Sequence, residues 1–65
     1  MTIIEAMSHV KNGKQLTRKA WFNGVYVAVV NGLLQVVWPD GAHNIWRADL
    51  DDILESDWRI EGETL

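Results

Sequence analysis

The six-residue segment from Arg18 to Asn23 holds two cations, two aromatic rings and an amide. A guanidinium can bind a phosphate through two parallel hydrogen bonds, and flat aromatic rings stack on the faces of nucleobases. An amide side chain can both donate to and accept from a ribose or a base edge. The segment therefore predicts a site for a small nucleotide-like ligand, with contacts from Arg18, Trp21, Phe22 and Asn23.

A second group of such side chains follows later in the chain. Asn44 and Trp46 stand two residues apart, which places them on one face of an extended strand, and Arg47 adds a cation. We include these three residues in the predicted ligand-binding site. A second interpretation stays open, because tryptophan is usually buried. Trp21 and Trp46 could instead belong to the core or to a subunit interface, with the cations in solvent.

The sequence predicts neither an enzyme nor a metal site. The residues that flank His43 give no Ser-His-Asp or Cys-His signature, and the chain has no cysteine. The glycines stand in predicted turns and form no phosphate-binding loop. The run from Asp49 to Asp52 lacks the glycine and the glutamate of a calcium loop and favours a helix start instead. We therefore expect no catalysis, no metal and no cofactor.

Length and charge narrow the possible partners. The chain has 65 residues and a net charge of −3, which predicts a single domain over 1–65 and argues against binding to duplex nucleic acid. No apolar run approaches the roughly 18 residues of a membrane span, so we expect no membrane partner. The first residues also lack the basic stretch of a signal peptide, which predicts a cytoplasmic protein.

Local patterns predict an N-terminal helix over 3–11. Thr2 and Glu5 have the spacing of a capping box, and apolar residues then recur at helical intervals. The pair Asn12-Gly13 ends the helix, because glycine tolerates the left-handed conformation that follows a last turn.

The rest of the sequence predicts an α+β fold. It is a meander of four to five antiparallel strands, with the N-terminal helix and a short second helix before the last strand. Asn31-Gly32 is a strong hairpin signal, because both central residues of a type I′ turn need positive φ. The expected elements are a short edge strand around Leu16, strands 25–30 and 33–38, a turn at 39–41, strand 42–46, a helix within 48–55, strand 57–61 and a frayed end at 62–65.

The size of the chain and its central strand also predict an oligomer. A chain this short buries only about 60% of its unfolded surface, and it has no cysteine for disulfides. Both faces of strand 25–30 are mostly apolar, so both need cover. The N-terminal helix can cover one face, and we expect a second copy of the protein to cover the other.

Three motifs follow one another at spacings that resemble those of a known family. They are Glu5-Ala6 with Lys11-Asn12-Gly13-Lys14 and Arg18-x-x-Trp21, then Asn23-Gly24-Val25-Tyr26, and finally Trp46 with Asp52-Ile53-Leu54-Glu55-Ser56-Asp57-Trp58. The family consists of small phage domains and includes the second Thoeris anti-defence protein, a sponge for immune signalling nucleotides. The resemblance covers almost the whole chain, and it departs from the family's usual Pro-Ser at Arg47-Ala48-Asp49.

The resemblance implies a phage protein that acts without catalysis in the cytoplasm of the host bacterial cell. Such proteins form homo-oligomers, with a tetramer favoured and a dimer possible. They sequester a cyclic nucleotide of the glycocyclic ADP-ribose type or a cyclic oligonucleotide. Carried over by motif, the resemblance gives Arg18 a phosphate contact, Trp21 and Trp46 base stacking, and Asn23 a polar contact with ribose or base.

Two other functions stay open on the sequence. Four of the six basic residues lie in the first 30 positions, whereas eight of the nine carboxylates lie in the last 35. The acidic half would suit a small protein inhibitor that binds a basic surface of a bacterial defence complex such as a CRISPR effector. The tryptophans would also suit a structural phage subunit.

Overall fold

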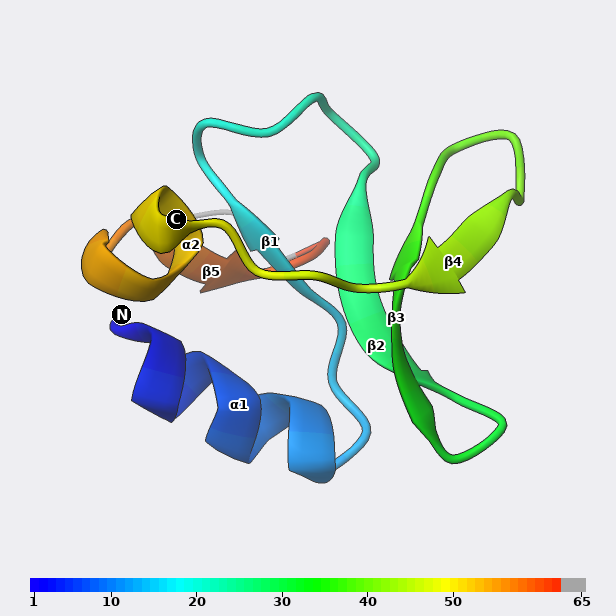
Figure 1. The fold of residues 1–65 in the computed structure, drawn as a ribbon, viewed down its shortest axis with the longest axis horizontal. Coiled ribbons are helices and arrows are strands. Elements are labelled where there is room, and N and C mark those ends of the chain that lie inside the picture. Colours follow the sequence, from blue (N-terminus) through cyan, green and yellow to red (C-terminus); the bar gives the residue numbers. More distant parts are fainter. Residues whose placement is uncertain (63–65) are drawn as a thin grey trace.

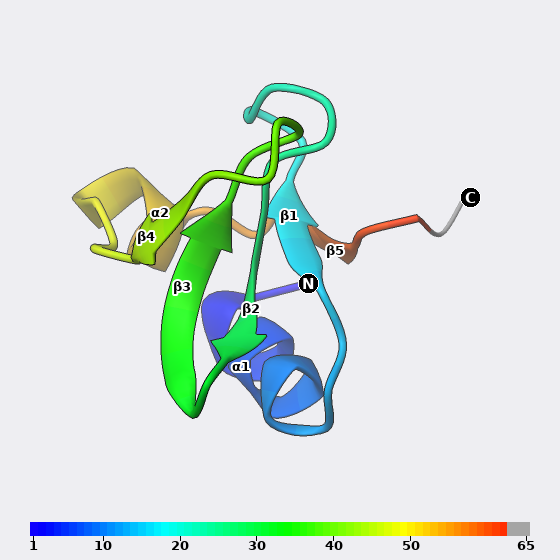
Figure 2. The same cartoon turned by 90° about the vertical axis from the view of Figure 1, so that its right-hand side faces the viewer.

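Five short antiparallel strands and two helices make up the fold in this computed structural model, which describes residues 1–62 (Figures 1 and 2). The strands form one sheet in the order β4-β3-β2-β1-β5, so the last strand pairs with the first. The predicted α+β class and the short second helix before the last strand are confirmed. The elements are α1 (Ile3–Lys11), β1 (Leu16–Arg18), β2 (Tyr26–Val30), β3 (Leu33–Val37), β4 (His43–Ile45), α2 (Leu50–Leu54) and β5 (Trp58–Ile60).

Helix α1 has the bounds that the sequence predicts, because both of its ends carry strong local signals. The Glu5 amide donates to Thr2 Oγ1 at 3.4 Å, and the Thr2 amide donates to Glu5 Oε1 at 3.1 Å. The Thr2 amide and the Thr2 hydroxyl both donate to Glu5 Oε1 at 3.1 Å, and these two bonds hold the pKa of the Glu5 carboxyl below its ordinary value. At the other end Gly13 takes a φ of 90°, a conformation that only glycine adopts without strain.

The central hairpin joins β2 to β3 through the predicted turn. Asn31 and Gly32 both have positive φ, at 53° and 78°, as a type I′ turn requires. The tight turn sets the register directly, with Val30 opposite Leu33 beside it. A second turn follows β3, where the Gly41 amide donates to the Trp38 carbonyl at 2.9 Å.

Strand β1 was predicted as an edge strand, and this prediction is wrong. It lies inside the sheet between β2 and β5, and its three residues pair with all three residues of β5. Its polar side chains suggested exposure, yet Thr17 and Arg18 are both buried. The Thr17 hydroxyl donates to the Val25 carbonyl at 2.6 Å, so its burial leaves no unpaired donor. The pairing partner lies about 40 positions further along, where no local pattern can indicate it.

The core lies between the sheet and helix α1. Its fully buried members are small in number, and partly buried hydrophobic residues pack around them. The segment 46–49 crosses in front of the sheet from β4 to α2 and brings Trp46 onto this core (Figure 1). The buried cluster consists of Ala6, Val10, Leu16, Val27 and Trp58.

The outer face of β2 has no helix over it within residues 1–62 (Figure 2). Its side chains there, Tyr26, Ala28 and Val30, are each half-buried. The second copy expected over this face stays a prediction. No helix in the described range is long and apolar enough to cross a membrane. Of the end predicted to fray, only Gly62 lies within the described residues.

Candidate ligand-binding site

Three tryptophans from distant parts of the chain meet at one end of the core. The ring centroids of Trp21 and Trp58 are 5.2 Å apart, those of Trp46 and Trp58 5.7 Å, and those of Trp21 and Trp46 6.4 Å. All three pairs meet edge to face, the arrangement that aromatic quadrupoles favour. The segments that carry them were predicted separately, and nothing in the local sequence indicated that the rings would touch.

The three rings differ in exposure. Trp58 is buried, and its Nε1 donates to the Asp52 carbonyl at 2.9 Å, which fixes the ring. Trp21 and Trp46 are half-buried and each keep part of their surface in solvent. Both rings pack on the core, as the second interpretation expects, and each also leaves aromatic surface exposed. Their contact with a ligand stays a prediction. This pair is the only part of the predicted stacking platform whose rings the structure brings together within the described residues.

Arg18 lies inside the protein and binds two carboxylates. Its Nη1 donates to Asp52 Oδ1 at 2.8 Å, and its Nε donates to Asp57 Oδ1 at 2.8 Å. A longer bond of 3.4 Å runs from Nη2 to Asp57 Oδ2. With 8% of the side chain exposed, this geometry does not favour the predicted phosphate contact, because a phosphate would have to displace a carboxylate. The two carboxylates are structural partners of Arg18 that sequence reasoning missed, since they lie 34 and 39 residues away.

The ion pairs shift the protonation of both partners in the direction that keeps them charged. The hydrogen bond from Arg18 holds the pKa of the Asp57 carboxyl below its ordinary value, and the bond to Asp57 raises the pKa of Arg18. Asp57 also ties down the start of the next loop, because its carbonyl accepts the Lys19 amide at 3.2 Å and its Oδ2 accepts the Ala20 amide at 3.3 Å. The network therefore fixes the backbone just before Trp21.

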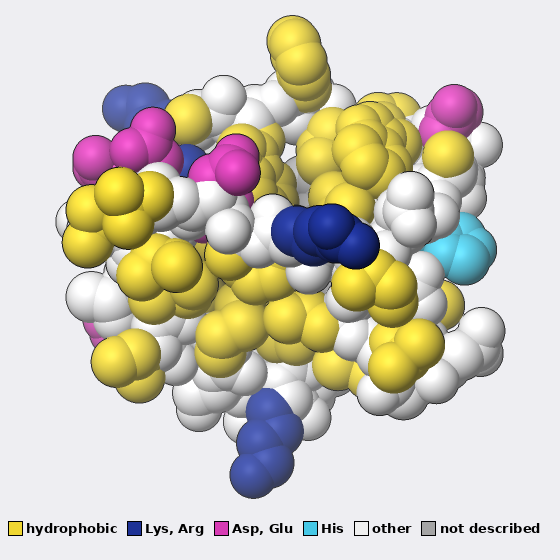
Figure 3. Space-filling model, viewed as in Figure 1, with side chains coloured by type: hydrophobic (Ala, Val, Ile, Leu, Met, Phe, Trp, Pro, Cys, Tyr) yellow, Lys and Arg dark blue, Asp and Glu magenta, His cyan; other side chains and the backbone are white. Residues whose placement is uncertain are grey.

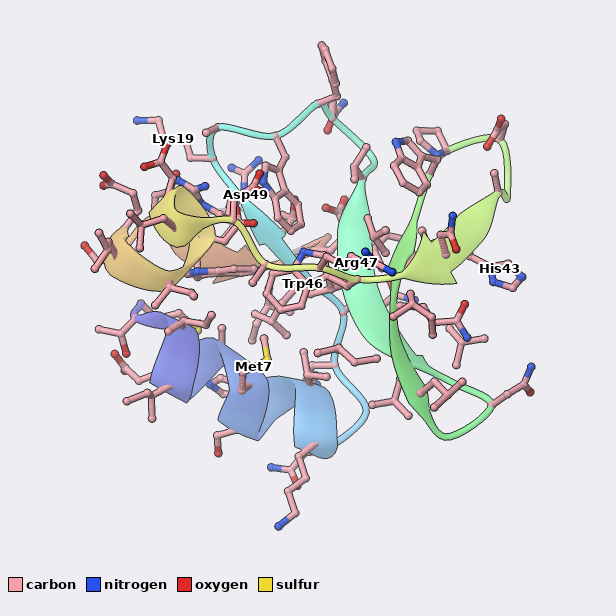
Figure 4. All side chains as sticks on the ribbon, in the orientation of Figure 1. Met7, Lys19, His43, Trp46, Arg47 and Asp49 are labelled. Atoms are coloured by element: carbon pink, nitrogen blue, oxygen red, sulfur yellow. The ribbon has the colours of Figure 1, made fainter. Side chains whose placement is uncertain are left out.

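Arg47 occupies the opposite kind of environment. It is exposed on the segment that crosses the sheet, next to Trp46, and Figure 4 shows both on the same face of the molecule. Both ion pairs found within residues 1–62 belong to Arg18, so neither involves Arg47. The backbone beneath Arg47 is anchored, because the Trp46 amide donates to the Leu34 carbonyl at 3.2 Å. This cation is free to meet an anion from solvent.

The three remaining predicted residues are exposed. Asn44 lies on β4, and its Oδ1 accepts the Ile45 amide at 3.1 Å. Phe22 and Asn23 lie on the loop between β1 and β2, and Phe22 is 86% exposed. Gly24 closes this loop at a φ of 90°, and a Cβ there would come within 2.9 Å of the Pro39 ring. The loop is thus held close to the β3–β4 turn, although no contact places Phe22 or Asn23 against the tryptophan pair.

Other parts of the described chain offer less for a ligand. A shallow depression is lined by Gly13, Lys14, Gln15, Ile60, Glu61 and Gly62, none of which was predicted as a site residue. Residues 1–62 hold no group of three or more His, Asp or Glu side chains that could bind a metal ion.

A family model described as the Thoeris anti-defense 2-like domain matches residues 1–61. The chain belongs to the Thoeris anti-defense 2-like family. The match spans every helix and strand of the fold, including Trp21, Trp46 and Trp58. The family is a phage anti-defence family of binding proteins rather than known enzymes, and it implies a nucleotide signal as the molecule that is bound. No match is found among curated proteins.

Proposed function

We propose that this protein binds a cyclic nucleotide immune signal and sequesters it, uncleaved, in the cytoplasm of the host bacterial cell. The signal is of the glycocyclic ADP-ribose type or a cyclic oligonucleotide. The observation that carries the proposal is the half-buried pair Trp21 and Trp46 beside the exposed cation of Arg47. Membership of the Thoeris anti-defense 2-like family supports the same class of ligand.

Each proposed contact follows from the chemistry of its side chain. Arg47 binds a phosphate oxygen, because its guanidinium is exposed and outside the ion pairs of the described chain. Trp21 and Trp46 pack against a base or a ribose, and the exposed amides of Asn44 and Asn23, each two residues from one of these rings in the sequence, are polar groups that the ligand can reach. The edge-to-face contacts with Trp58 hold both rings in place before the ligand arrives, which reduces the entropy lost on binding. Arg18 has no role in this site beyond holding its framework.

The charge around the site disfavours a ligand with a terminal phosphate. Arg47 is followed closely by Asp49 and Asp51, which are exposed carboxylates. A terminal phosphate carries a charge of about −1.5 to −2 at neutral pH, whereas each phosphate of a closed ring carries about −1. Repulsion from the carboxylates therefore penalises a nucleotide with a terminal phosphate, such as AMP, more than a cyclic nucleotide, whereas linear ADP-ribose has no terminal phosphate and carries the same charge as its cyclic isomers.

Sequestration requires affinity rather than turnover. A Kd near 1 nM corresponds to a binding free energy of about −12 kcal/mol. The stacked base, the charge-assisted phosphate contact and the other contacts of the site must supply it together. A ligand at 100 times its Kd stabilises the folded state by about 2.7 kcal/mol. In a domain of this size that should raise the melting temperature by roughly 10 °C or more.

A thermal-shift panel tests the proposal. It holds glycocyclic and cyclic ADP-ribose isomers, cyclic dinucleotides and cyclic trinucleotides, with linear ADP-ribose and AMP as controls. We expect a shift with one cyclic ligand and none with AMP, loss of that shift in Arg47→Ala, and its retention in the matched variant Lys14→Ala. The bound ligand should be recovered intact by chromatography after the protein is denatured. A flat panel, or a ligand recovered as a cleavage product, would overturn the proposal.

The exposed carboxylates of α2 and its cap favour one alternative. Asp49, Asp51 and Glu55 all point to solvent, and none belongs to an ion pair found in residues 1–62. They would let the protein act as a small acidic inhibitor of a bacterial defence complex instead. A complex with a basic host protein that forms without nucleotide and weakens with salt would favour that function. A structural phage subunit, which also needs no ligand, would show neither behaviour.

A further inference from the structure

The proposed ligand contacts lie on two stretches of backbone outside the helices and strands. Trp21 follows β1 on the loop to β2, whereas Trp46 and Arg47 lie on segment 46–49 between β4 and α2. Backbone outside regular structure moves readily unless other contacts hold it. The contacts that hold these two stretches therefore decide whether the rings and the cation stay in place for a ligand.

One carboxylate holds the stretch that leads to Trp21. Asp57 Oδ2 accepts the Ala20 amide at 3.3 Å, and the Asp57 carbonyl accepts the Lys19 amide at 3.2 Å. The Trp21 amide then donates to the Arg18 carbonyl at 3.0 Å, which closes a turn. The other carboxylate oxygen, Asp57 Oδ1, accepts Arg18 Nε at 2.8 Å. Asp57 thus ties the backbone of residues 19–21 to the Arg18 side chain.

A second carboxylate holds segment 46–49 in the same way. Asp52 Oδ2 accepts the Asp49 amide at 2.9 Å, and Asp52 Oδ1 accepts Arg18 Nη1 at 2.8 Å. At its other end the segment is fixed to β3 by the hydrogen bond of the Trp46 amide. Arg47 therefore lies on a short span that is anchored on both sides.

Burial sets Asp52 apart from the other carboxylates in and around α2. Figure 3 shows most of the acidic side chains on this face gathered beside α2, where Asp49, Asp51 and Glu55 are exposed. Asp52 is the one buried residue of the helix, and only 7% of its side chain is exposed. A buried carboxylate needs a cation beside it, so Asp52 is committed to Arg18.

Arg18 joins the two arrangements through its rigid shape. Its N–H groups form a planar fork, so Nε and Nη1 fix the places of Asp57 and Asp52 relative to each other. Each carboxylate gives one oxygen to Arg18 and the other to one backbone amide. An asparagine has a single acceptor oxygen and cannot do both, because its NH₂ group would face a donor.

We propose that Asp57 and Asp52 are positioning residues of the ligand site, each for one of its two stretches. Asp57 holds Trp21, and Asp52 holds segment 46–49 with its ring and its cation. Loss of either carboxylate should release its own stretch and leave the other in place. The effect on a ligand rests on the proposed function, whereas the effect on the backbone is measured without any ligand.

Nitrogen–proton NMR spectra of the free protein test this division. The four tryptophans give four indole signals, which single Trp→Phe variants assign. We expect Asp57→Asn to shift or broaden the Trp21 indole and the amides of residues 19–21, and Asp52→Asn to do so for the Trp46 indole and residues 47–49. Glu55→Gln loses the same charge from an exposed site and should change neither set. Changes in both sets in each variant, or in neither, would overturn the proposal.

Hydrogen exchange in the wild type tests the same contacts without a substitution. The amides of Ala20 and Asp49 should exchange more slowly than those of Phe22 and Ala48, for which residues 1–62 show no hydrogen bond. Equally fast exchange at all four amides would overturn the proposal, even if an asparagine variant fails to fold.

Calorimetric titration with the glycocyclic ADP-ribose isomers and cyclic oligonucleotides then measures the effect on the ligand. Each asparagine variant should raise the Kd by roughly tenfold, as the loss of a stacked ring does, and Glu55→Gln should leave it unchanged. The titration is made where circular dichroism shows every variant fully folded. An unchanged Kd beside displaced rings would overturn the positioning role. Absence of binding by the wild type would overturn the proposed function instead, and the NMR spectra would still decide what the two carboxylates hold.

Discussion

Two arginines of this protein lie in opposite surroundings. Arg18 is buried and held by Asp52 and Asp57, whereas Arg47 is exposed beside Trp46 and lies outside both ion pairs of the described chain. The first cation is satisfied within the fold and contributes to its framework. The second is available to a ligand or to a neighbouring copy. The difference shows that distant carboxylates, rather than flanking residues, decide which arginine is free.

The two environments also predict different losses of folding stability when the arginine is replaced. Removing one partner of a buried ion pair leaves a charge without a counterion, which costs about 3–5 kcal/mol. Removing an exposed arginine usually changes stability by no more than about 0.5 kcal/mol. We therefore expect substitution of Arg18 to lower stability, and substitution of Arg47 to weaken ligand binding with little effect on stability.

The largest expected effect is on stability in Arg18→Met. This substitution leaves Asp52 and Asp57 facing each other without the cation, so we expect the free energy of unfolding to fall by about 3 kcal/mol or more. Urea denaturation followed by tryptophan fluorescence measures it. The matched variant Arg47→Met should unfold within about 0.5 kcal/mol of the wild type. Equal stability of the two variants would contradict the claim that Arg18, unlike Arg47, stabilises the fold.

A second effect is expected on ligand affinity in Arg47→Ala. A hydrogen bond to a charged group contributes about 1.5–3 kcal/mol, so the Kd for the cyclic nucleotide should rise by roughly tenfold to a hundredfold. The melting temperature without ligand should stay unchanged. Calorimetric titration gives the Kd, and Lys14→Ala serves as the control with the same loss of charge. An unchanged Kd in Arg47→Ala would place the phosphate elsewhere.

A comparable or smaller loss of affinity is expected from the aromatic platform. Stacking of a base on an aromatic side chain contributes about 1–3 kcal/mol, so Trp21→Leu should weaken binding, whereas Trp21→Phe should retain part of it. Trp21 also packs on Trp58, so the melting temperature of each variant must be measured beside its Kd. A Kd that follows the melting temperature alone would assign Trp21 to the core and not to the site.

The smallest expected effect is on the pH dependence of stability. Because Arg18 lowers the pKa of Asp57 in the folded state, the unfolded chain takes up the proton first on acidification. This contribution is complete above the ordinary Asp pKa of about 4 and is lost as the pH falls through the lower folded value. Asp57→Asn should reduce the acid slope of unfolding, and Arg47→Met should keep it. Glu5, with its lowered pKa, adds to the same slope in all variants.

The elements that the sequence predicted well depend on signals a few residues apart. The capping box of Thr2 and Glu5 set the start of α1, and Asn31-Gly32 set the register of the central hairpin. Pairing over long sequence distances could not be predicted in this way. The position of β1 inside the sheet depends on β5, and the role of Arg18 depends on carboxylates that follow it by 34 and 39 residues.

The candidate site shows the same division between local and distant information. The sequence indicated aromatic and cationic residues of the right types, including Trp46 and Arg47, but it could not rank Arg47 above Arg18. Burial made that distinction, because only the folded chain shows which guanidinium already has its carboxylates. The tryptophans could not be assigned to core or surface from sequence, since Trp21 and Trp46 pack on the core and still keep part of each ring exposed.

The most direct test of the central claim is calorimetric titration of glycocyclic ADP-ribose isomers and cyclic oligonucleotides into the wild type and Arg47→Ala. The account predicts tight binding of one cyclic ligand by the wild type, at least tenfold weaker binding by Arg47→Ala, and no binding of AMP. Absence of binding by every cyclic nucleotide, or equal affinity in the two proteins, would contradict it.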